Sequence, residues 1–175
     1  MSGELASRFR FRPPWYQGIA TPDPEQYGGG TILLASEGRK ISPQAIALAA
    51  RMARTAGAGV HVLTVARIWG SALGLPHPGL KPTRSELQQQ HDLIAETIAA
   101  LKGKGVAADG EIVSSRSAAR RIAREARRHR VGAIVMSADP PRHWLIADLL
   151  WSQEPYRVRR LADVPVYTVL DESQS

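Results

Sequence analysis

Short apolar runs alternate with segments of helical period along the chain from Thr31 onward. Each run has the length of a strand and is bounded by turn residues, whereas the intervening segments repeat apolar residues every three or four positions, as helices do. The predicted strands cover residues 31–36, 60–65, 106–113, 131–137 and 164–170. The predicted helices cover residues 43–56, 83–101 and 117–129, with a shorter one beginning at 152. This order predicts an α/β fold: a five-stranded, open, mostly parallel sheet with helices on both faces.

Local signals place the ends of several elements. Ser42-Pro43 is typical of a helix N-cap with proline at the first helical position, and Gly57 is a natural helix stop. Thr83-x-x-Glu86 has the spacing of a capping box, and Ser115 or Ser117 is expected to cap the third helix. Two residues affect the prediction of individual strands. Gly110 weakens the third strand, and Pro165 suits an edge position for the last one.

The first thirty residues differ from the rest of the chain. They contain several prolines and glycines and the alternating sequence Arg8-Phe-Arg-Phe-Arg12, and they show no helical period. We therefore expect an extended arm at residues 1–30, an α/β domain at residues 31–170 and an acidic tail at residues 171–175. The arm contributes little to the predicted core. Either it is a disordered tail, or it docks on another surface through its aromatic residues; these are Phe9, Phe11, Trp15 and Tyr16.

Composition fits one globular domain, since 43% of the 175 residues are hydrophobic. There is no cysteine, which excludes disulfides and thiolate chemistry. The sequence contains no apolar run long enough to cross a bilayer, and its first residues lack the apolar segment of a secretory signal. A cytoplasmic location is the expectation.

The net charge of +7 is concentrated in one part of the chain. Residues 116–160 carry eleven basic and four acidic side chains, and the predicted third helix holds only one acid, Glu125. Its arginines, apart from Arg130, fall within an arc of about 140°. This face is either an ordinary solvated surface or a site for nucleic acid or another phosphate-rich partner. It comprises Arg116, Arg120, Arg121, Arg124, Arg127 and Arg128.

Catalytic and metal motifs are not evident. The sequence contains no nucleophile-elbow motif and no phosphate-loop lysine, so we predict no enzymatic activity. The five histidines do not have metal-ligand spacing with one another or with acids, so no metal site is predicted, and His61 is expected to pack in or beside a strand. Ligands of open α/β sheets bind beyond the carboxyl ends of the strands. After the fourth predicted strand, that place holds Asp139, Pro140 and Pro141 instead of a glycine-rich cradle.

Several segments, in this order, resemble the universal stress protein family. Thr31-Ile-Leu-Leu-Ala-Ser-Glu-Gly38 is similar to its first strand and acidic turn, and His61-Val-Leu-Thr-Val65 to its second strand. Ala133-Ile-Val-Met-Ser137 and Val164-Pro-Val-Tyr-Thr-Val169 are similar to its fourth and last strands. The resemblance covers residues 31–170. It implies a Rossmann-like fold related to the adenine nucleotide alpha hydrolases, a homodimer and an adenine-nucleotide site, with the dimer formed along the last strand through Val164, Val166 and Val169.

Nucleotide-binding members of that family carry the pattern G-x2-G-x9-G-S/T after strand four. The resemblance places the first glycine at Ser137 and the second at Pro140, which has no N–H to donate to a phosphate. Ser152 matches the final small residue only if the loop is two residues longer. Glu37 replaces the usual aspartate, and Val65 takes the position whose backbone faces adenine. The nucleotide-binding set implied by the resemblance is Ala35, Glu37, Val65, Ser137 and Ser152.

Three functions follow as hypotheses. The first is a non-enzymatic binding domain of universal-stress type, which dimerises and docks on a partner or larger complex without tight ATP binding or another cofactor. The second is an adenine-nucleotide sensor that binds ATP or AMP. The third is an RNA- or ribosome-associated factor that uses the arginine-rich helix.

Overall fold

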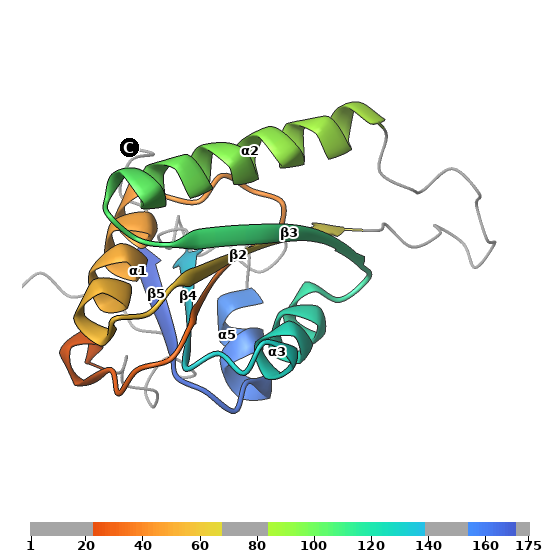
Figure 1. The fold of residues 1–175 in the computed structure, drawn as a ribbon. Helices are drawn as coiled ribbons and strands as arrows, with labels where there is room; N and C mark the ends of the chain where they lie inside the picture. The colour runs from red at the N-terminus through yellow and green to blue at the C-terminus, as the bar shows by residue number, and fades with distance from the viewer. Residues whose placement is uncertain (1–22, 68–83, 139–153, 171–175) are drawn as a thin grey trace, which may run out of the picture.

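The computed structural model describes residues 23–67, 84–138 and 154–170. Five strands form one sheet in the order β3-β2-β1-β4-β5, and every neighbouring pair is parallel (Figure 1). The strands are β1 (Ile32–Ser36), β2 (Val60–Arg67), β3 (Ala108–Ser115), β4 (Ala133–Ala138) and β5 (Val166–Leu170). The helices are α1 (Pro43–Ala56), α2 (Arg84–Gly103), α3 (Ala118–Arg128) and α5 (Glu154–Leu161), with a short 3-10 helix, η2 (Pro24–Gln26). The predicted fold class is confirmed, and β5 is an edge strand, as Pro165 indicated.

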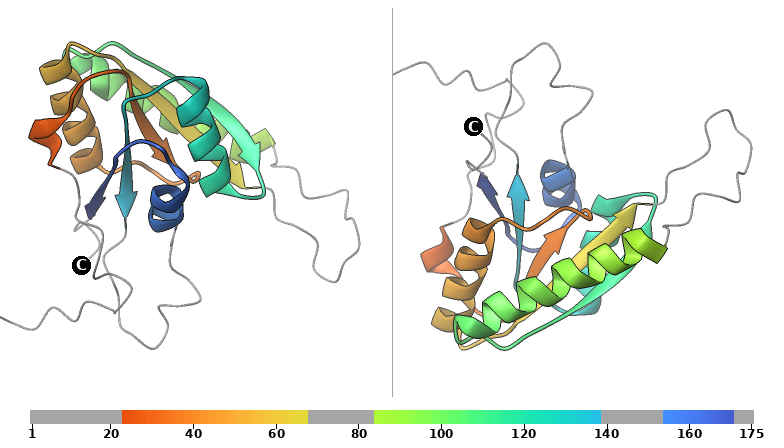
Figure 2. Two further views of the ribbon diagram at one scale, coloured as in Figure 1. Left: turned by 90° about the horizontal axis from the view of Figure 1, so that it is seen from below. Right: turned by 90° about the horizontal axis from the view of Figure 1, so that it is seen from above.

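The helices cover both faces of the sheet. Helices α1 and α2 lie on one face, and α3 and α5 lie on the other (Figure 2). Alternate residues of each strand therefore enter two separate cores. In β1, Ile32 and Leu34 pack toward α1, whereas Leu33 and Ala35 pack toward α3. All four are buried, as expected for a central strand covered on both sides.

The caps show why helix α1 begins and ends where the sequence predicts. The Ser42 hydroxyl accepts a hydrogen bond from the Ala45 amide at 3.2 Å, and Pro43 occupies the first turn. At the other end, Gly57 adopts a left-handed conformation with φ of 61°, which a residue with a side chain adopts only with strain. Thr83 of the expected capping box and Ser152 lie outside the described residues.

Two serines form the turn that precedes α3. Ser117 occupies the N-cap position but makes no capping bond with its side chain. The Ser115 hydroxyl instead accepts from the Ser117 amide at 3.1 Å and donates to the Ser117 carbonyl at 3.0 Å. Both residues that the sequence offered as caps therefore take part in the turn that leads into the helix.

Gly110, which weakened the prediction of the third strand, is explained by close packing. A Cβ at this position would lie 2.7 Å from the Val62 carbonyl oxygen and 3.3 Å from a methyl group of Ile94. Glycine is therefore required where β3 passes between β2 and α2. The strand forms at Ala108–Ser115, slightly later than the sequence indicated.

The segment just before β1 packs on the domain, although the sequence assigned it to the arm. Tyr27 packs against the core on the α1 face, and its hydroxyl donates to the Gly30 carbonyl at 2.6 Å. The Tyr167 hydroxyl of β5 donates to the Asp23 carbonyl at 3.4 Å. The end of the arm, from residue 23, thus contributes to the core. Phe9, Phe11, Trp15 and Tyr16 lie outside the described residues.

Candidate functional site

The sheet has one topological switch point, between β1 and β4. The chain builds outward from β1 through β2 to β3, then returns to the other side of β1 for β4 and β5. The connections after β1 and β4 therefore leave in opposite directions. The region beyond the carboxyl ends of these two strands, which we call the crevice, is the place where open α/β sheets bind ligands. The described residues that border this crevice come from the end of β1, the start of α1, the end of β4 and the first half of α2.

A tight turn follows β1. The Ser36 hydroxyl accepts a hydrogen bond from the Arg39 amide at 3.1 Å and donates to the Arg39 carbonyl. Glu37 and Gly38 lie between these residues and are both half-buried. Gly38 has a φ of 81°, in the left-handed region that favours glycine. Serine and glycine together fix this turn, so the backbone beside Glu37 is held in one conformation.

Ser137, at the end of β4, is bonded to the start of α1. Its hydroxyl accepts from the Ser42 amide at 3.0 Å and donates to the Ser42 hydroxyl at 3.1 Å. Ser42 in turn caps α1. The hydroxyl that stands at the family's first phosphate-loop glycine is therefore already engaged with the protein, and it satisfies an amide at a helix N-terminus that would otherwise be available to an anion.

Gln90 of α2 contacts the turn that follows β1. Its amide nitrogen donates to the Gly38 carbonyl at 2.8 Å. A Cβ added at Gly38 would contact both the Gln90 amide and the Val65 carbonyl oxygen, so these three residues meet at one point. The Gln90 Oε1 atom is buried and has no hydrogen-bond partner among the described residues. An unsatisfied acceptor thus lies near the backbone of Val65.

The structure gathers most of the nucleotide-binding residues that the resemblance implied. Ala35, Glu37, Val65 and Ser137 all lie at the carboxyl ends of the central strands, whereas Ser152 lies outside the described residues. Two further residues of the site, Ser42 and Gln90, were not identified from the sequence. Ser42 was recognised only as a helix cap, and nothing in the local sequence of Gln90 indicates that its side chain reaches the turn after β1.

The arginine-rich helix α3 makes more ion pairs than its own sequence suggests. Glu125 is almost fully buried, with Arg121 Nε 2.9 Å and Arg128 Nη1 3.1 Å from its carboxylate. Arg127 reaches Asp163, beyond α5, at 3.0 Å. Arg124 Nε lies 3.9 Å from Glu125.

Glu125 of the helix itself and Asp163 from beyond α5 therefore neutralise part of this face. Arg116 and Arg120 are both exposed and form no ion pair with the residues that the structure describes. The helix itself contains almost no acids, which suggested a free basic surface. Its surroundings, however, do contain acids that pair with it.

The sheet order and the helices on both faces define a doubly wound α/β domain. The universal stress protein family model matches residues 30–169, and the chain belongs to that family. The comparison with curated proteins finds no significant match. No helix in the described segments is both long and apolar enough to span a membrane.

Solved structures of the family share this fold at low sequence identity. A universal stress protein from Archaeoglobus fulgidus is 17% identical and superposes with a TM-score of 0.60 over 79% of this chain and 92% of its own. One from Burkholderia pseudomallei is 21% identical, with a TM-score of 0.59 over 80% of this chain and 95% of its own. An Archaeoglobus fulgidus structure in complex with dAMP is 14% identical, with a TM-score of 0.58 over 81% and 98%.

Proposed function

We propose that this chain is a non-catalytic binding domain of the universal stress family, which acts through protein partners and does not bind ATP tightly. The observation that carries this proposal is the engagement of Ser137 with the start of α1. A phosphate in that place would have to displace two hydrogen bonds. Pro140, which follows, offers no amide to replace them.

A second candidate function is weak binding of an adenine nucleotide through its base. The unpartnered Gln90 Oε1 favours it, because a buried acceptor without a donor is costly and an exocyclic amino group would supply that donor. The Val65 carbonyl lies beside it and offers another acceptor. Relatives whose structures contain dAMP or AMP show that the family's fold accommodates such ligands.

Calorimetry with adenosine, AMP and ATP separates the two candidates. If the phosphate end of the crevice is closed, ATP binds no more tightly than AMP or adenosine. Binding of ATP at least about tenfold tighter than adenosine, or about 1.4 kcal/mol, would contradict the first proposal. Should any of the three ligands bind, Gln90→Ala is expected to weaken it. Gln88→Ala is the matched control, because Gln88 lies on the same helix and bonds only to Asp92 among the partners described.

Partner binding is assigned to two other features. The arm before residue 23 holds four aromatic residues that a partner surface would bury, and the open edge of β5 offers backbone groups to a second copy. RNA binding through α3 is the less favoured alternative, because Arg121, Arg127 and Arg128 already pair with acids of the same chain.

A further inference from the structure

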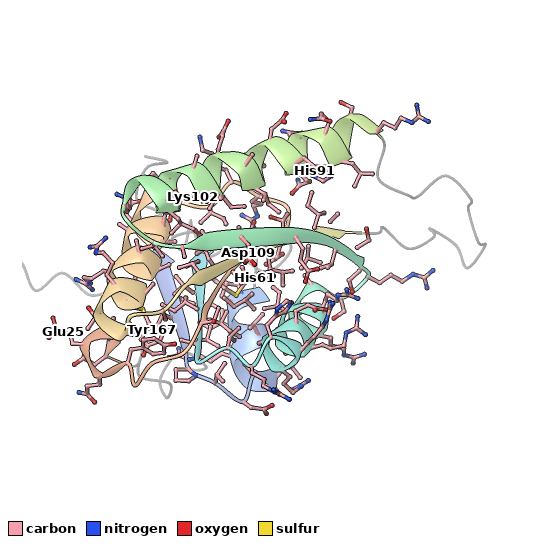
Figure 3. The ribbon with its side chains drawn as sticks, in the orientation of Figure 1. Glu25, His61, His91, Lys102, Asp109 and Tyr167 are labelled. Atoms are coloured by element: carbon pink, nitrogen blue, oxygen red, sulfur yellow. The ribbon has the colours of Figure 1, made fainter. Side chains whose placement is uncertain are left out.

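Two histidines and a glutamate from distant parts of the chain meet beside the β2–β3 edge. His61 comes from β2, Glu111 from β3 and His129 from the residue that ends α3. Their ligand atoms all lie within 4.8 Å of one another. The cluster lies on the α3 face, near the amino ends of the strands, and so opposite the crevice formed by the carboxyl ends. Figure 3 labels His61 and its neighbour Asp109 on the adjacent strands.

His61 is held with one ring nitrogen facing the cluster. Its side chain is only 9% exposed, and Nδ1 lies 2.7 Å from Asp109 Oδ1. Because an ionised carboxylate only accepts hydrogen bonds, a neutral His61 ring in this contact carries its proton on Nδ1 and a lone pair on Nε2. Nε2 is buried and has no hydrogen-bond partner among the described residues.

The carboxylate of Glu111, which is the acid of this cluster, is an acceptor and cannot donate a hydrogen bond to this lone pair. Glu111 Oε1 lies 3.7 Å from His61 Nε2, too far for a hydrogen bond, and 3.3 Å from His129 Nε2. The two imidazole rings stack, with centroids 4.2 Å apart. Two ring nitrogens and a carboxylate oxygen thus lie within 4.8 Å of one another, and a cation among them would satisfy the unpaired lone pair.

We propose that His61, Glu111 and His129 form a site for a divalent transition metal of the Zn²⁺ type. Tetrahedral zinc binds imidazole nitrogen and carboxylate oxygen at about 2.0–2.2 Å, which sets its ligand atoms roughly 3.4 Å apart. Two of the present separations are 3.3 and 3.7 Å and the third is at most 4.8 Å, so metal binding requires the ligand atoms to approach one another by at most about 1.4 Å. Asp109 acts as a positioning residue, since a carboxylate that fixes the other ring nitrogen is the usual partner of a metal-bound histidine.

The charges around the cluster are compatible with a bound cation. Asp109 and Glu111 supply two negative charges, while Glu125 is paired with Arg121. Arg128 Nη1 lies 3.8 Å from Glu111, but its side chain is 62% exposed and has Glu125 as a nearer partner. It can therefore turn into solvent when a metal binds.

Three protein ligands leave a fourth position for water or a further ligand. Glu111 is 32% exposed and His129 is 30% exposed, which gives a metal a path from solvent. The mixed nitrogen and oxygen donors favour Zn²⁺ over Mg²⁺ or Ca²⁺, which prefer oxygen alone. A metal here would join the edge strand β3 to α3, so binding should stabilise the folded chain.

The test uses the full chain, free of any histidine tag and treated with a chelator. Zn²⁺ is added in a thermal melt and in equilibrium dialysis, and Co²⁺ is used as a spectroscopic probe of tetrahedral coordination. We expect one tightly bound Zn²⁺ per chain, a higher melting temperature and visible Co²⁺ absorption. Mg²⁺ at the same concentration should leave the melting temperature unchanged.

Variants locate the metal. Glu111→Gln and His129→Gln, both at partly exposed positions, should abolish the Co²⁺ absorption, and Asp109→Asn should weaken Zn²⁺ binding by roughly 10–100-fold. His91→Ala, on the exposed face of α2, is the control and should bind Zn²⁺ as the wild type does. Absence of stoichiometric Zn²⁺ binding, or binding unchanged in Glu111→Gln and His129→Gln, would overturn the proposal. Because the cluster is separate from the crevice, Gln90→Ala should retain the metal whatever the outcome with nucleotides.

Discussion

At the scale of single residues, two tyrosine hydroxyls join the segment before β1 to the domain. Burial raises the pKa of Tyr27, and the neighbouring Tyr167 raises it further. Burial also raises the pKa of Tyr167, with an added contribution from the charge of Asp23. Both hydroxyls donate to backbone carbonyls, and ionisation would remove the proton that each bond requires.

These raised pKa values predict a loss of stability at alkaline pH. An unfolded tyrosine titrates near 10.0, the ordinary value for both residues, whereas the folded chain keeps its tyrosines protonated to higher pH. Their contribution is therefore complete below pH 10 and is lost as the pH rises through the folded pKa. Urea unfolding at several pH values should show a shallower alkaline decline for the double variant Tyr27→Phe, Tyr167→Phe than for wild type. Lysine titration affects both proteins alike, so equal slopes would show that the tyrosines do not contribute.

The residues that matter most at this scale were the hardest to identify from the sequence. His61, Glu111 and His129 are far apart in the chain, so the local spacing used to search for metal ligands did not reveal them. Glu125 was recognised as the only acid of its helix, but its burial beside Arg121 and Arg128 was not predicted. Ser42 and Gln90 show the same limit, because hydrogen bonds between distant segments leave no periodic pattern.

At the scale of elements, β5 is an open edge of the sheet. Val166 is buried in the core, and Val164 and Val169 are half-buried and pack against the two cores. These side chains therefore pack within the chain itself. The groups that remain available to a partner at this edge are the backbone amides and carbonyls. The Ile134 amide donates to the Pro165 carbonyl, so alternate residues point toward β4 and Thr168 points its amide to the open side.

We expect a homodimer formed along this edge, and Thr168→Pro should weaken it. Proline removes the outward amide and leaves the pairing with β4 in place. Light scattering across a dilution series should show a shift toward monomer, with the melting temperature at high dilution little changed. Ser114→Pro is the matched control, because Ser114 is exposed at an outward position of β3, the opposite edge. A wild type that is monomeric throughout, or a dimer lost only in Ser114→Pro, would contradict this assignment.

Elements were predicted more completely than sites because their signals are local. Every expected strand and helix in the described segments is present, since each is set by its own apolar period and by caps such as Ser42 and Gly57. The strand order was not deduced from these signals. It depends on which faces bury against which helices, and the family resemblance supplied the architecture that the local pattern left open.

At the scale of the whole molecule, the two proposed sites lie at opposite ends of the parallel strands of one sheet. Their carboxyl ends form the crevice with Ser137 and Gln90, and the opposite half carries the proposed metal cluster. The segment from Asp23 to Gly30 lies along the β4–β5 side, where Tyr27 and Gly29 approach Gly132. The sequence predicted a complete domain from residue 31, because the prolines and glycines before it are typical of a linker. Such residues do not indicate which surface the segment packs against.

The last prediction concerns how far the arm belongs to the domain. A Cβ at Gly132 would overlap the Gly29 carbonyl and the Tyr27 hydroxyl, so Gly132→Ala must push this segment off the domain. In the full chain, we expect a loss of roughly 1–3 kcal/mol of unfolding free energy, the usual cost of overpacking. Deleting residues 1–22 should leave stability unchanged, whereas deleting residues 1–30 should lower it and make Gly132→Ala nearly neutral, because the clashing groups are gone.

Gly103→Ala, at the end of α2 with open space around its Cβ, is the control and should behave alike in both backgrounds. Chemical denaturation of the four proteins that combine the 1–30 deletion with Gly132→Ala measures the coupling directly. An equal cost of Gly132→Ala with and without residues 1–30 would show that the arm does not pack there. With the predicted coupling, residues 1–22 are the part of the arm left to bind a partner, since residues 23–30 are already bound to the domain.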